Sequence, residues 1–303
     1  MQLTAKNRSI SVCIVELKRM VRKMIPLDRI EKWLPKLTKS ARRYLRPDEL
    51  AQYESIPEGE RERQLAALLT APIANFTVIN EVFFRDRWGE VMDRLIPGGK
   101  LALLEVASGD ADMIPQCMAR TRPGSLYITA NMNEKLNESL MQRIDGLPIT
   151  VRLIKDDAAN VLQHLEASKV DIIAFQHAVN DVLQAILCGQ YGIDTVYSDW
   201  METLPYMIKL LQKEVAAGTL NEHVREPFMN LMKSLWPTLR TGGVVAINHY
   251  MFQLDLDWGY PPKLFEHLVP MIREWLKELP GYDEVMLDGF DPQWWIFLKK
   301  RQG

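Results

Sequence analysis

From about residue 100 onward, short apolar runs alternate with amphipathic stretches. The apolar runs predict strands at residues 101–105, 125–130, 149–154, 170–176 and 244–249. The amphipathic stretches around 112–120, 133–144 and 157–168 predict helices between them. A repeated strand–helix order is typical of an α/β protein with a parallel sheet covered by helices on both faces. The right-handed crossover rule makes a doubly wound sheet the simplest topology.

The C-terminal segment has a different pattern. Residues 262–279 predict a helix that ends at Pro280-Gly281, and two strand-like runs follow at 283–287 and 294–299. The short connection between these runs fits a hairpin and is too short for a crossover helix. We therefore expect a mostly parallel seven-stranded sheet that is finished by an antiparallel hairpin.

Residues 1–95 have the periodicity of helices throughout. The predicted elements are a helix over 12–24, a short element over 30–37, a helix starting at Pro47, and helices over 60–69 and 74–95. We expect this region to be a helical cap over a site or an oligomerisation surface, such as the interface of a homodimer. We assign residues 96–303 to the α/β domain.

An insertion interrupts this domain after the fourth strand. The fifth strand does not begin until about residue 243, and a helix over 226–239 accounts for only part of the interval. Residues 183–225 remain as extra helical material that projects from the carboxyl edge of the sheet. Long insertions at that edge are often lids, so we expect one here.

Composition narrows the class of protein. The 303-residue chain is 47% hydrophobic and has a net charge of -2, so no global basic field indicates a nucleic-acid partner. Its three cysteines (Cys13, Cys117 and Cys188) are widely spaced and suggest neither a disulfide nor a zinc motif, which fits a reducing cytoplasm. No run is long enough to span a membrane, and charges inside the N-terminal apolar stretch argue against a signal peptide.

Residues 100–112 (KLALLEVASGDAD) read as a buried strand, a turn of small residues and the start of a helix. Such a turn lets a ligand approach the backbone, and a helix N-terminus offers free N–H groups. Glu105 would lie at the carboxyl end of the strand, where open α/β sheets bind ligands. The segment therefore predicts a ligand site, although any strand–helix corner of an α/β protein could share this pattern.

Four segments resemble motifs of the class I S-adenosylmethionine-dependent methyltransferases. They are residues 105–111 (EVASGDA), 156–158 (DDA), 171–180 (DIIAFQHAVN) and 239–245 (LRTGGVV). The resemblance covers roughly residues 95–300 and identifies no subfamily. It implies a Rossmann-like fold, S-adenosyl-L-methionine as cofactor and methyl transfer as the reaction.

The resemblance also implies which residues bind the cofactor. Glu105 would face the methionine ammonium group, and Asn131 stands where the family commonly has an acid for the ribose hydroxyls. The turn keeps one glycine where the family commonly has two or three. The full set of cofactor-binding residues is Glu105, Ala107, Ser108, Gly109, Asn131, Met132, Asp156, Asp157, Ala158, Gln176 and His177. Asp156 and Asp157 could equally be helix N-caps.

Residues after the fourth and fifth strands are candidates for catalysis and substrate binding. His177, His249 and Asp181 could supply a general base, although a histidine at such a place can also be purely structural. The candidate substrate-binding residues are Asn180, Tyr197, Trp200, Tyr206, Tyr250 and Trp258, whose aromatic members could instead be ordinary packing. The two histidines could also hold a metal with Asp181, Asp199 or Asp255, but no compact ligand spacing supports one.

We therefore expect a cytoplasmic biosynthetic enzyme that transfers a methyl group from S-adenosylmethionine to an O or N atom of a small molecule, with no nucleic-acid or membrane partner. Two alternatives stay open at this point. One is an enzyme with the same cofactor fold and another chemistry, such as aminopropyl transfer or a cyclase-like reaction. The other is a non-catalytic binding relative.

Overall fold

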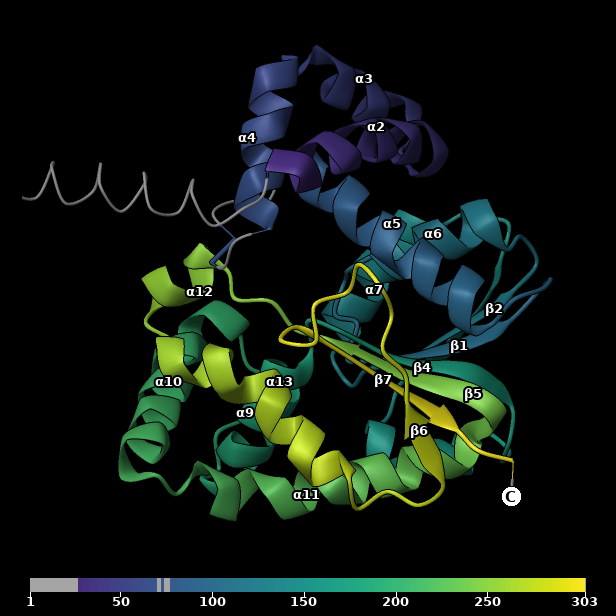
Figure 1. Ribbon diagram of the computed structural model, residues 1–303. Coiled ribbons are helices and arrows are strands. Elements are labelled where there is room, and N and C mark those ends of the chain that lie inside the picture. Colours follow the sequence, from purple (N-terminus) through teal and green to yellow (C-terminus); the bar gives the residue numbers. More distant parts are fainter. Residues whose placement is uncertain (1–26, 70–71, 74–76, 303) are drawn as a thin grey trace, which may run out of the picture. The chain divides into compact units, whose positions relative to one another are not determined.

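The computed structural model describes residues 27–69, 72–73 and 77–302 (Figure 1). The chain divides into two compact units between Phe83 and Phe84, inside helix α5 (Val78–Leu95). Among the described helices, none combines the length and the apolar character needed to cross a membrane.

The first unit is helical, with α2 (Leu27–Tyr44), α3 (Pro47–Ser55), α4 (Glu58–Leu68) and the start of α5. The predicted start at Pro47 is confirmed, but the short element over 30–37 is wrong because α2 continues past Pro35 to Tyr44. The apolar face carries on beyond the proline through buried Leu37, Ala41 and Tyr44, and this packing outweighs the hydrogen bond lost at Pro35. The helix predicted over 12–24 lies outside the described residues, and pairing of two copies through this region stays a prediction.

The second unit contains one seven-stranded sheet in the order β3-β2-β1-β4-β5-β7-β6. Its strands are β1 (Ala102–Val106), β2 (Leu126–Ala130), β3 (Thr150–Ile154), β4 (Val170–Gln176), β5 (Leu239–Asn248), β6 (Tyr282–Glu284) and β7 (Trp295–Lys300). The first five strands are parallel, and β7 runs antiparallel to both β5 and β6. This confirms the doubly wound sheet with a C-terminal hairpin, which is the fold that the methyltransferase resemblance implies.

Helices cover both faces of this sheet. They are α6 (Met113–Thr121), α7 (Glu134–Ile144), α8 (Val161–His164), α9 (Val179–Gln190), α10 (Trp200–Ala217), α11 (Leu220–Leu235), α12 (Gln253–Trp258) and α13 (Pro262–Leu276). Figure 1 shows the later part of α5 and α6 on one face and α11 and α13 on the other. The helix predicted over 226–239 in fact begins at Leu220, because buried Leu220 and Val224 extend its apolar face toward the N-terminus. The helix predicted over 157–168 is reduced to a 3-10 turn and the four residues of α8.

Successive side chains along each strand point to opposite faces of the sheet, so each face has its own part of the core. Leu104, Phe175 and Ile247 join the cluster that includes Phe228 and Phe265 of α11 and α13. On the other face, buried Arg122 lies beside the C-terminal end of α5. Its guanidinium bonds to Asp93 at 2.8 Å and to the carbonyls of Ile96 and Gly99. The central strands β1, β4 and β5 are thus largely buried on both faces of the sheet.

Gly243 lies within β5, where the pairing with β4 shifts register between Val170 and Ile172. A Cβ atom at this position would approach the carbonyl oxygens of Arg240 and Asp171 to 2.9 Å. The fifth strand was predicted only from residue 244, whereas β5 begins at Leu239 and includes the Gly242-Gly243 pair. Gly243 is thus required by the close approach of two backbone segments.

We expect Gly243→Ala to lower the free energy of unfolding by about 1–3 kcal/mol, because the added methyl group meets backbone atoms that cannot rotate away. Denaturant unfolding of the full chain measures this effect. Gly189→Ala is the matched control, since nothing lies within 4 Å of a Cβ there. As Gly189 is inside α9, we expect that control to be neutral or stabilising by about 0.5–1 kcal/mol. Equal effects of the two substitutions would contradict the close approach at Gly243.

Candidate functional site

The two central strands both end in a residue with left-handed backbone. Ala107 after β1 has φ 52° and His177 after β4 has φ 53°, although neither is glycine. The His177 N–H donates to the backbone carbonyl and to the side-chain oxygen of Asn248, each at 3.0 Å. Non-glycine residues in this region cost about 1 kcal/mol or more and concentrate at functional sites. Because β1 and β4 are neighbours, this strain marks one place on the carboxyl edge of the sheet.

The turn after β1 is held to both adjacent elements. The Ser108 hydroxyl lies 2.7 Å from that of Thr129 on β2. The Asp110 carboxylate accepts hydrogen bonds from Ser139 and Arg143 of α7 at 2.9 and 2.8 Å. Gly109 has φ 58°, which favours glycine although space around it is open. The predicted backbone positions Ala107, Ser108 and Gly109 therefore form a fixed turn in front of α6.

Glu105 is buried at the end of β1 and is only 1% exposed. Its carboxyl oxygen accepts a hydrogen bond from the Tyr127 hydroxyl of β2 at 2.7 Å. Burial raises the pKa of Glu105 to about 8, with a further contribution from the charge of Asp112, although the Tyr127 hydrogen bond opposes the rise. The carboxyl is therefore mostly protonated at neutral pH, and a cation placed beside it would favour the ionised form.

The candidates after β2 and β3 already make local hydrogen bonds. Asn131 accepts from the N–H of Asn133 at 3.0 Å, and Met132 beside it is 38% exposed. Asp157 caps the 3-10 turn Ala158–Asn160 by accepting from the N–H of Ala159.

Asp156 lies 2.7 Å from the Nε2 atom of His164 and accepts from Asn160 at 3.0 Å. These hydrogen bonds hold the pKa of Asp156 below its ordinary value. Asp157 therefore has the capping role that the sequence left open, and Asp156 is instead paired with His164. Contact of Asn131, Asp156, Asp157 and Ala158 with a cofactor stays a prediction.

A stack of rings occupies the ends of β4 and β5. The imidazoles of His177 and His249 are parallel with centroids 4.3 Å apart, and His249 stacks in turn on Phe265 at 5.3 Å. Phe252 meets His177 edge-on at 4.6 Å. Burial lowers the pKa of His177 to about 3 and that of His249 well below its ordinary value. Both imidazoles are therefore neutral at physiological pH and keep a nitrogen that can accept a proton or a hydrogen bond.

Several buried polar atoms around this stack have no hydrogen-bond partner in the described part of the chain. They are both ring nitrogens of His249, Nδ1 of His177, Oδ1 of Asn180 and Nδ2 of Asn248. His249 and Asn248 are fully buried, and Asn180 is 7% exposed. Buried polar atoms are paired in the great majority of native structures, so a cluster of unpaired ones indicates a place for a polar ligand. Gln176, the remaining candidate at this place, is already paired: its side-chain oxygen accepts a hydrogen bond from the indole N–H of Trp88.

Two carboxyl groups complete this end of the sheet. Burial and the nearby charge of Asp255 raise the pKa of Asp181 to about 7, and burial raises that of Asp255 to about 6. The Asp255 Oδ2 atom is 3.8 Å from Nε2 of His177. Tyr127 is not among the site residues predicted from the sequence, and Asp255 is considered there only as a metal ligand. The available signal for Asp255 was its acidic position in the first turn of the short helix α12, three residues after the N-cap Phe252.

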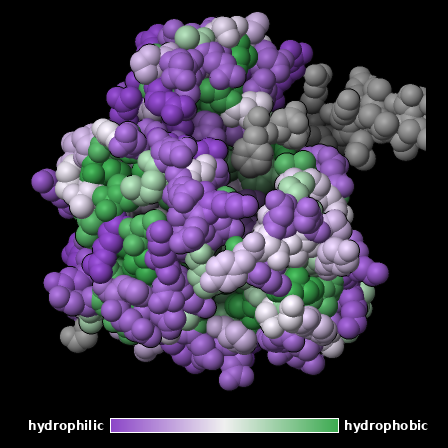
Figure 2. Space-filling view, turned by 180° about the vertical axis from the view of Figure 1, so that it is seen from behind, coloured by the Kyte–Doolittle hydropathy of each residue, from purple (hydrophilic) through white to green (hydrophobic). Residues whose placement is uncertain are grey.

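The aromatic candidates do not share one environment. Tyr197 and Tyr206 are 85% and 68% exposed, and Trp200 and Trp258 are also exposed. In contrast, Tyr250 is buried and its hydroxyl accepts from the indole N–H of Trp295 at 2.9 Å. Figure 2 shows apolar surface divided into patches by polar side chains. Substrate contacts by these aromatic residues stay predictions.

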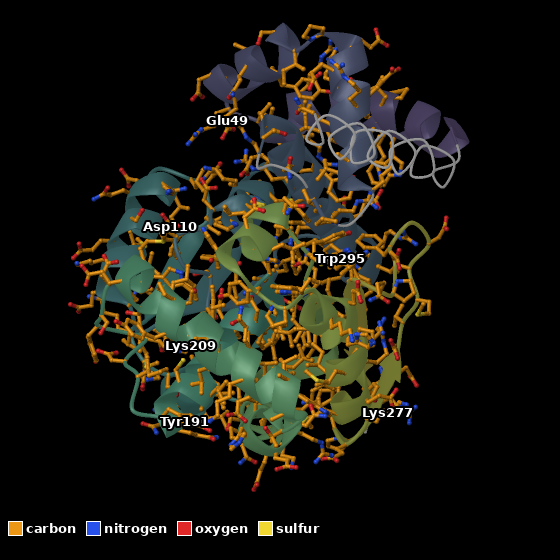
Figure 3. All side chains as sticks on the ribbon, turned by 90° about the vertical axis from the view of Figure 1, so that its left-hand side faces the viewer. Glu49, Asp110, Tyr191, Lys209, Lys277 and Trp295 are labelled. Carbon is orange, nitrogen blue, oxygen red and sulfur yellow. The ribbon has the colours of Figure 1, made fainter. Side chains whose placement is uncertain are left out.

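One part of the insertion lies beside the end of β2, where the Val196 carbonyl accepts from the side-chain amide of Asn133 at 2.9 Å. Another part lies further from the strand ends. Figure 3 shows Asp110, in the turn after β1, well separated from Tyr191 at the far end of α9. The Tyr191 hydroxyl donates to the Glu214 carboxylate of α10 at 3.0 Å, so this end of the insertion has its own polar packing. The first turn of α9, with Asn180 and Asp181, belongs to the candidate site, and a lid role for the insertion stays a prediction. In the described residues no group of three or more His, Cys, Asp or Glu side chains is arranged to hold a metal ion.

Comparison with known proteins gives similarity in fold only. No protein-family model matches the chain, and no curated protein matches it in sequence. Among solved structures, an SAH-bound methyltransferase of Podospora anserina is 11% identical with a TM-score of 0.40, over 92% of this chain and 99% of that one. A SAM-dependent methyltransferase of Aquifex aeolicus is 9% identical with a TM-score of 0.41, over 70% of this chain and 87% of that one. The carbon methyltransferase CurJ is 14% identical with a TM-score of 0.41, over 92% and 72%. Likeness at this level carries no argument about residues, and the fold assignment rests on the strand order.

We expect Glu105→Gln to change how stability depends on pH. The folded-state pKa of about 8 lies above the ordinary value of 4.5, so between these values the folded protein binds more protons than the unfolded chain. The free energy of unfolding of the wild type therefore falls as pH rises through this range, by roughly 3–5 kcal/mol from this group alone. Glutamine does not titrate and still accepts from Tyr127, so the variant lacks this fall.

Denaturant unfolding at several pH values from 5 to 9 tests the prediction. Glu138→Gln is the matched control, because Glu138 is exposed on α7 and its removal should leave the wild-type profile unchanged. Parallel profiles for wild type and Glu105→Gln would contradict a raised pKa at Glu105.

Proposed function

We propose that the chain is an S-adenosylmethionine-dependent methyltransferase that acts on an O or N atom of a small molecule. The observation that carries the proposal is the gathering of buried, strained and unpaired polar groups at the carboxyl ends of β1, β4 and β5. In a doubly wound sheet with this strand order, that edge is where a ligand reaches the strands. The class I methyltransferase fold makes S-adenosylmethionine the expected ligand there.

The residues present fit this cofactor. Glu105 would hold the methionine ammonium, and the turn at Ala107–Gly109 would lie against it through backbone atoms. Asn131 would bond the ribose, and Asp156 or Asp157 with Ala158 would bond the adenine. When bound, the cofactor supplies a methyl group on a sulfonium; the acceptor lone pair forms the new bond to carbon while the electrons of the broken C–S bond stay on sulfur.

This chain's own contribution is to position the acceptor, to exclude water and to remove a proton. His177 and His249 are neutral but are weak bases, because burial disfavours their protonated forms. Asp181, whose pKa is about 7, is better matched to accept a proton from an O–H or N–H group near neutral pH. We therefore assign Asp181 the role of base and the imidazoles the role of hydrogen-bond partners.

Isothermal titration with S-adenosylmethionine and with S-adenosylhomocysteine tests cofactor binding. We expect binding to the wild type and about 10–100-fold weaker binding to Glu105→Gln, which keeps the shape of the side chain but cannot become a carboxylate opposite the ammonium. Glu138→Gln should bind as the wild type does. Absence of binding to the wild type would overturn the proposal and favour a non-catalytic relative.

Incubation with candidate acceptors then tests the reaction. We expect S-adenosylhomocysteine to form in proportion to a methylated product. Release of methylthioadenosine would instead indicate aminopropyl transfer, and product formed without cofactor consumption would indicate a cyclase-like reaction.

A further inference from the structure

Two carboxyl-bearing residues follow the ends of β4 and β5, at the edge of the sheet that holds the His177–His249 stack. Asp181 lies in the first turn of α9, and Asp255 lies in α12, where it accepts from the N–H of Phe252 at 3.3 Å. Within the described residues, neither carboxylate forms an ion pair with a lysine or arginine; the neutral imidazole of His177 lies 3.8 Å from Asp255. A pair of poorly solvated acids without a counter-ion is a costly arrangement that a bound cation would relieve.

The titratable groups around this pair supply no positive charge. His177 and His249 are neutral, Tyr260 donates its hydroxyl to Gln184 at 2.8 Å, and Cys188 is buried beneath them. Burial and the charges of Asp181 and Asp255 raise the pKa of Tyr260, so these groups act on one another. When the two carboxylates are ionised, these groups together give the cluster a negative charge.

Independent of the acids, the cluster contains unpaired acceptors and aromatic rings. Oδ1 of Asn180 is buried without a partner, as are both nitrogens of His249, which can offer one acceptor. The ring of Phe252 stands edge-on beside His177. The side chains of His177 and Asp255 are 24% and 10% exposed, so a ligand can reach the cluster from solvent. Carboxylates, amide oxygens, imidazole nitrogens and aromatic rings together are the groups that recognise an ammonium ion.

We propose that Asp181, Asp255, Asn180 and the His177–His249 stack bind the protonated amine of an amine substrate. This inference rests on the proposed function, which it narrows from an O or N acceptor to a primary or secondary amine. In the reaction, the ammonium N–H passes its proton to the Asp181 carboxylate, which becomes a neutral acid. The amine is left with the lone pair that takes the methyl group.

Binding of two probes of matched shape tests the site. The first is 2-phenylethylamine, a cation at neutral pH, and the second is 2-phenylethanol, its neutral counterpart. At pH 8 we expect the full chain to bind the amine about tenfold or more tightly than the alcohol in isothermal titration. Equal affinities, or no binding of either probe, would overturn the proposal.

Substitutions then identify the groups responsible. Asp181→Asn and Asp255→Asn should each reduce the preference for the amine several-fold. Asp257→Asn should keep it, because Asp257 lies in the same helix α12 but is exposed and accepts only from Gln253. A preference that survives in both asparagine variants at the site would contradict the assignment.

The wild type alone gives a second test that does not depend on the variants folding. Because the pKa values of Asp181 and Asp255 are about 7 and 6, both are ionised at pH 8 and largely neutral at pH 5.5. Amine affinity should therefore fall about tenfold or more over this range while alcohol affinity stays constant. A constant amine affinity would count against the site.

The two proposals can fail separately. Amine preference without binding of S-adenosylmethionine would retain the ammonium site and remove the methyltransferase function. Binding of S-adenosylmethionine without amine preference would retain the methyltransferase function and remove the ammonium site.

Discussion

The parallel pairing of β4 with β1 and with β5 is the constraint on which the rest of this structure depends. Ile172, Ile173 and Phe175 of β4 are fully buried between helices on both faces, so the interior of the strand has no place for polar chemistry. Parallel strands bring their carboxyl ends to one edge, which is where hydrophobic burial stops. Glu105 and Gln176 are polar residues at the carboxyl ends of β1 and β4. Just after them, the chain turns sharply away from the sheet at Ala107 and His177.

These sharp turns explain why strain and desolvation occur together. His177 takes left-handed backbone because its N–H is fixed by two oxygens of Asn248, and its ring is thereby set parallel to that of His249. Packing of Phe252 and Phe265 against the rings removes water from them. The same dehydrated setting stabilises neutral imidazoles and neutral carboxyls, which makes the electrostatic state of the site sensitive to any charge that enters.

The central strands β1 and β4 could be predicted closely from sequence because each is a short apolar run that is largely buried on both faces. Sequence patterns were less informative where packing overrides a local signal, as in α2 beyond Pro35 and in β5 through Gly243. At the site, residues directly after strands were found because topology alone brings them to one edge. Tyr127 was missed because it lies in register with Leu103, and only its long side chain brings the hydroxyl to Glu105, two residues further along β1. Asp255 was considered only as a metal ligand, because it belongs to the site through the packing of a distant short helix.

The two outer strands of the sheet have a consequence for the chain's behaviour in concentrated solution. β6 has only three residues, and its Asp283 and Glu284 pair with Arg301 and Arg273, while the opposite edge β3 carries exposed Arg152 at its middle. Short or charged edges are poor templates for the addition of a foreign strand. The free backbone hydrogen-bonding groups of β3 and β6 are therefore disfavoured as sites for pairing with a strand of another molecule. An open sheet with these edges resists edge-to-edge aggregation into fibrils.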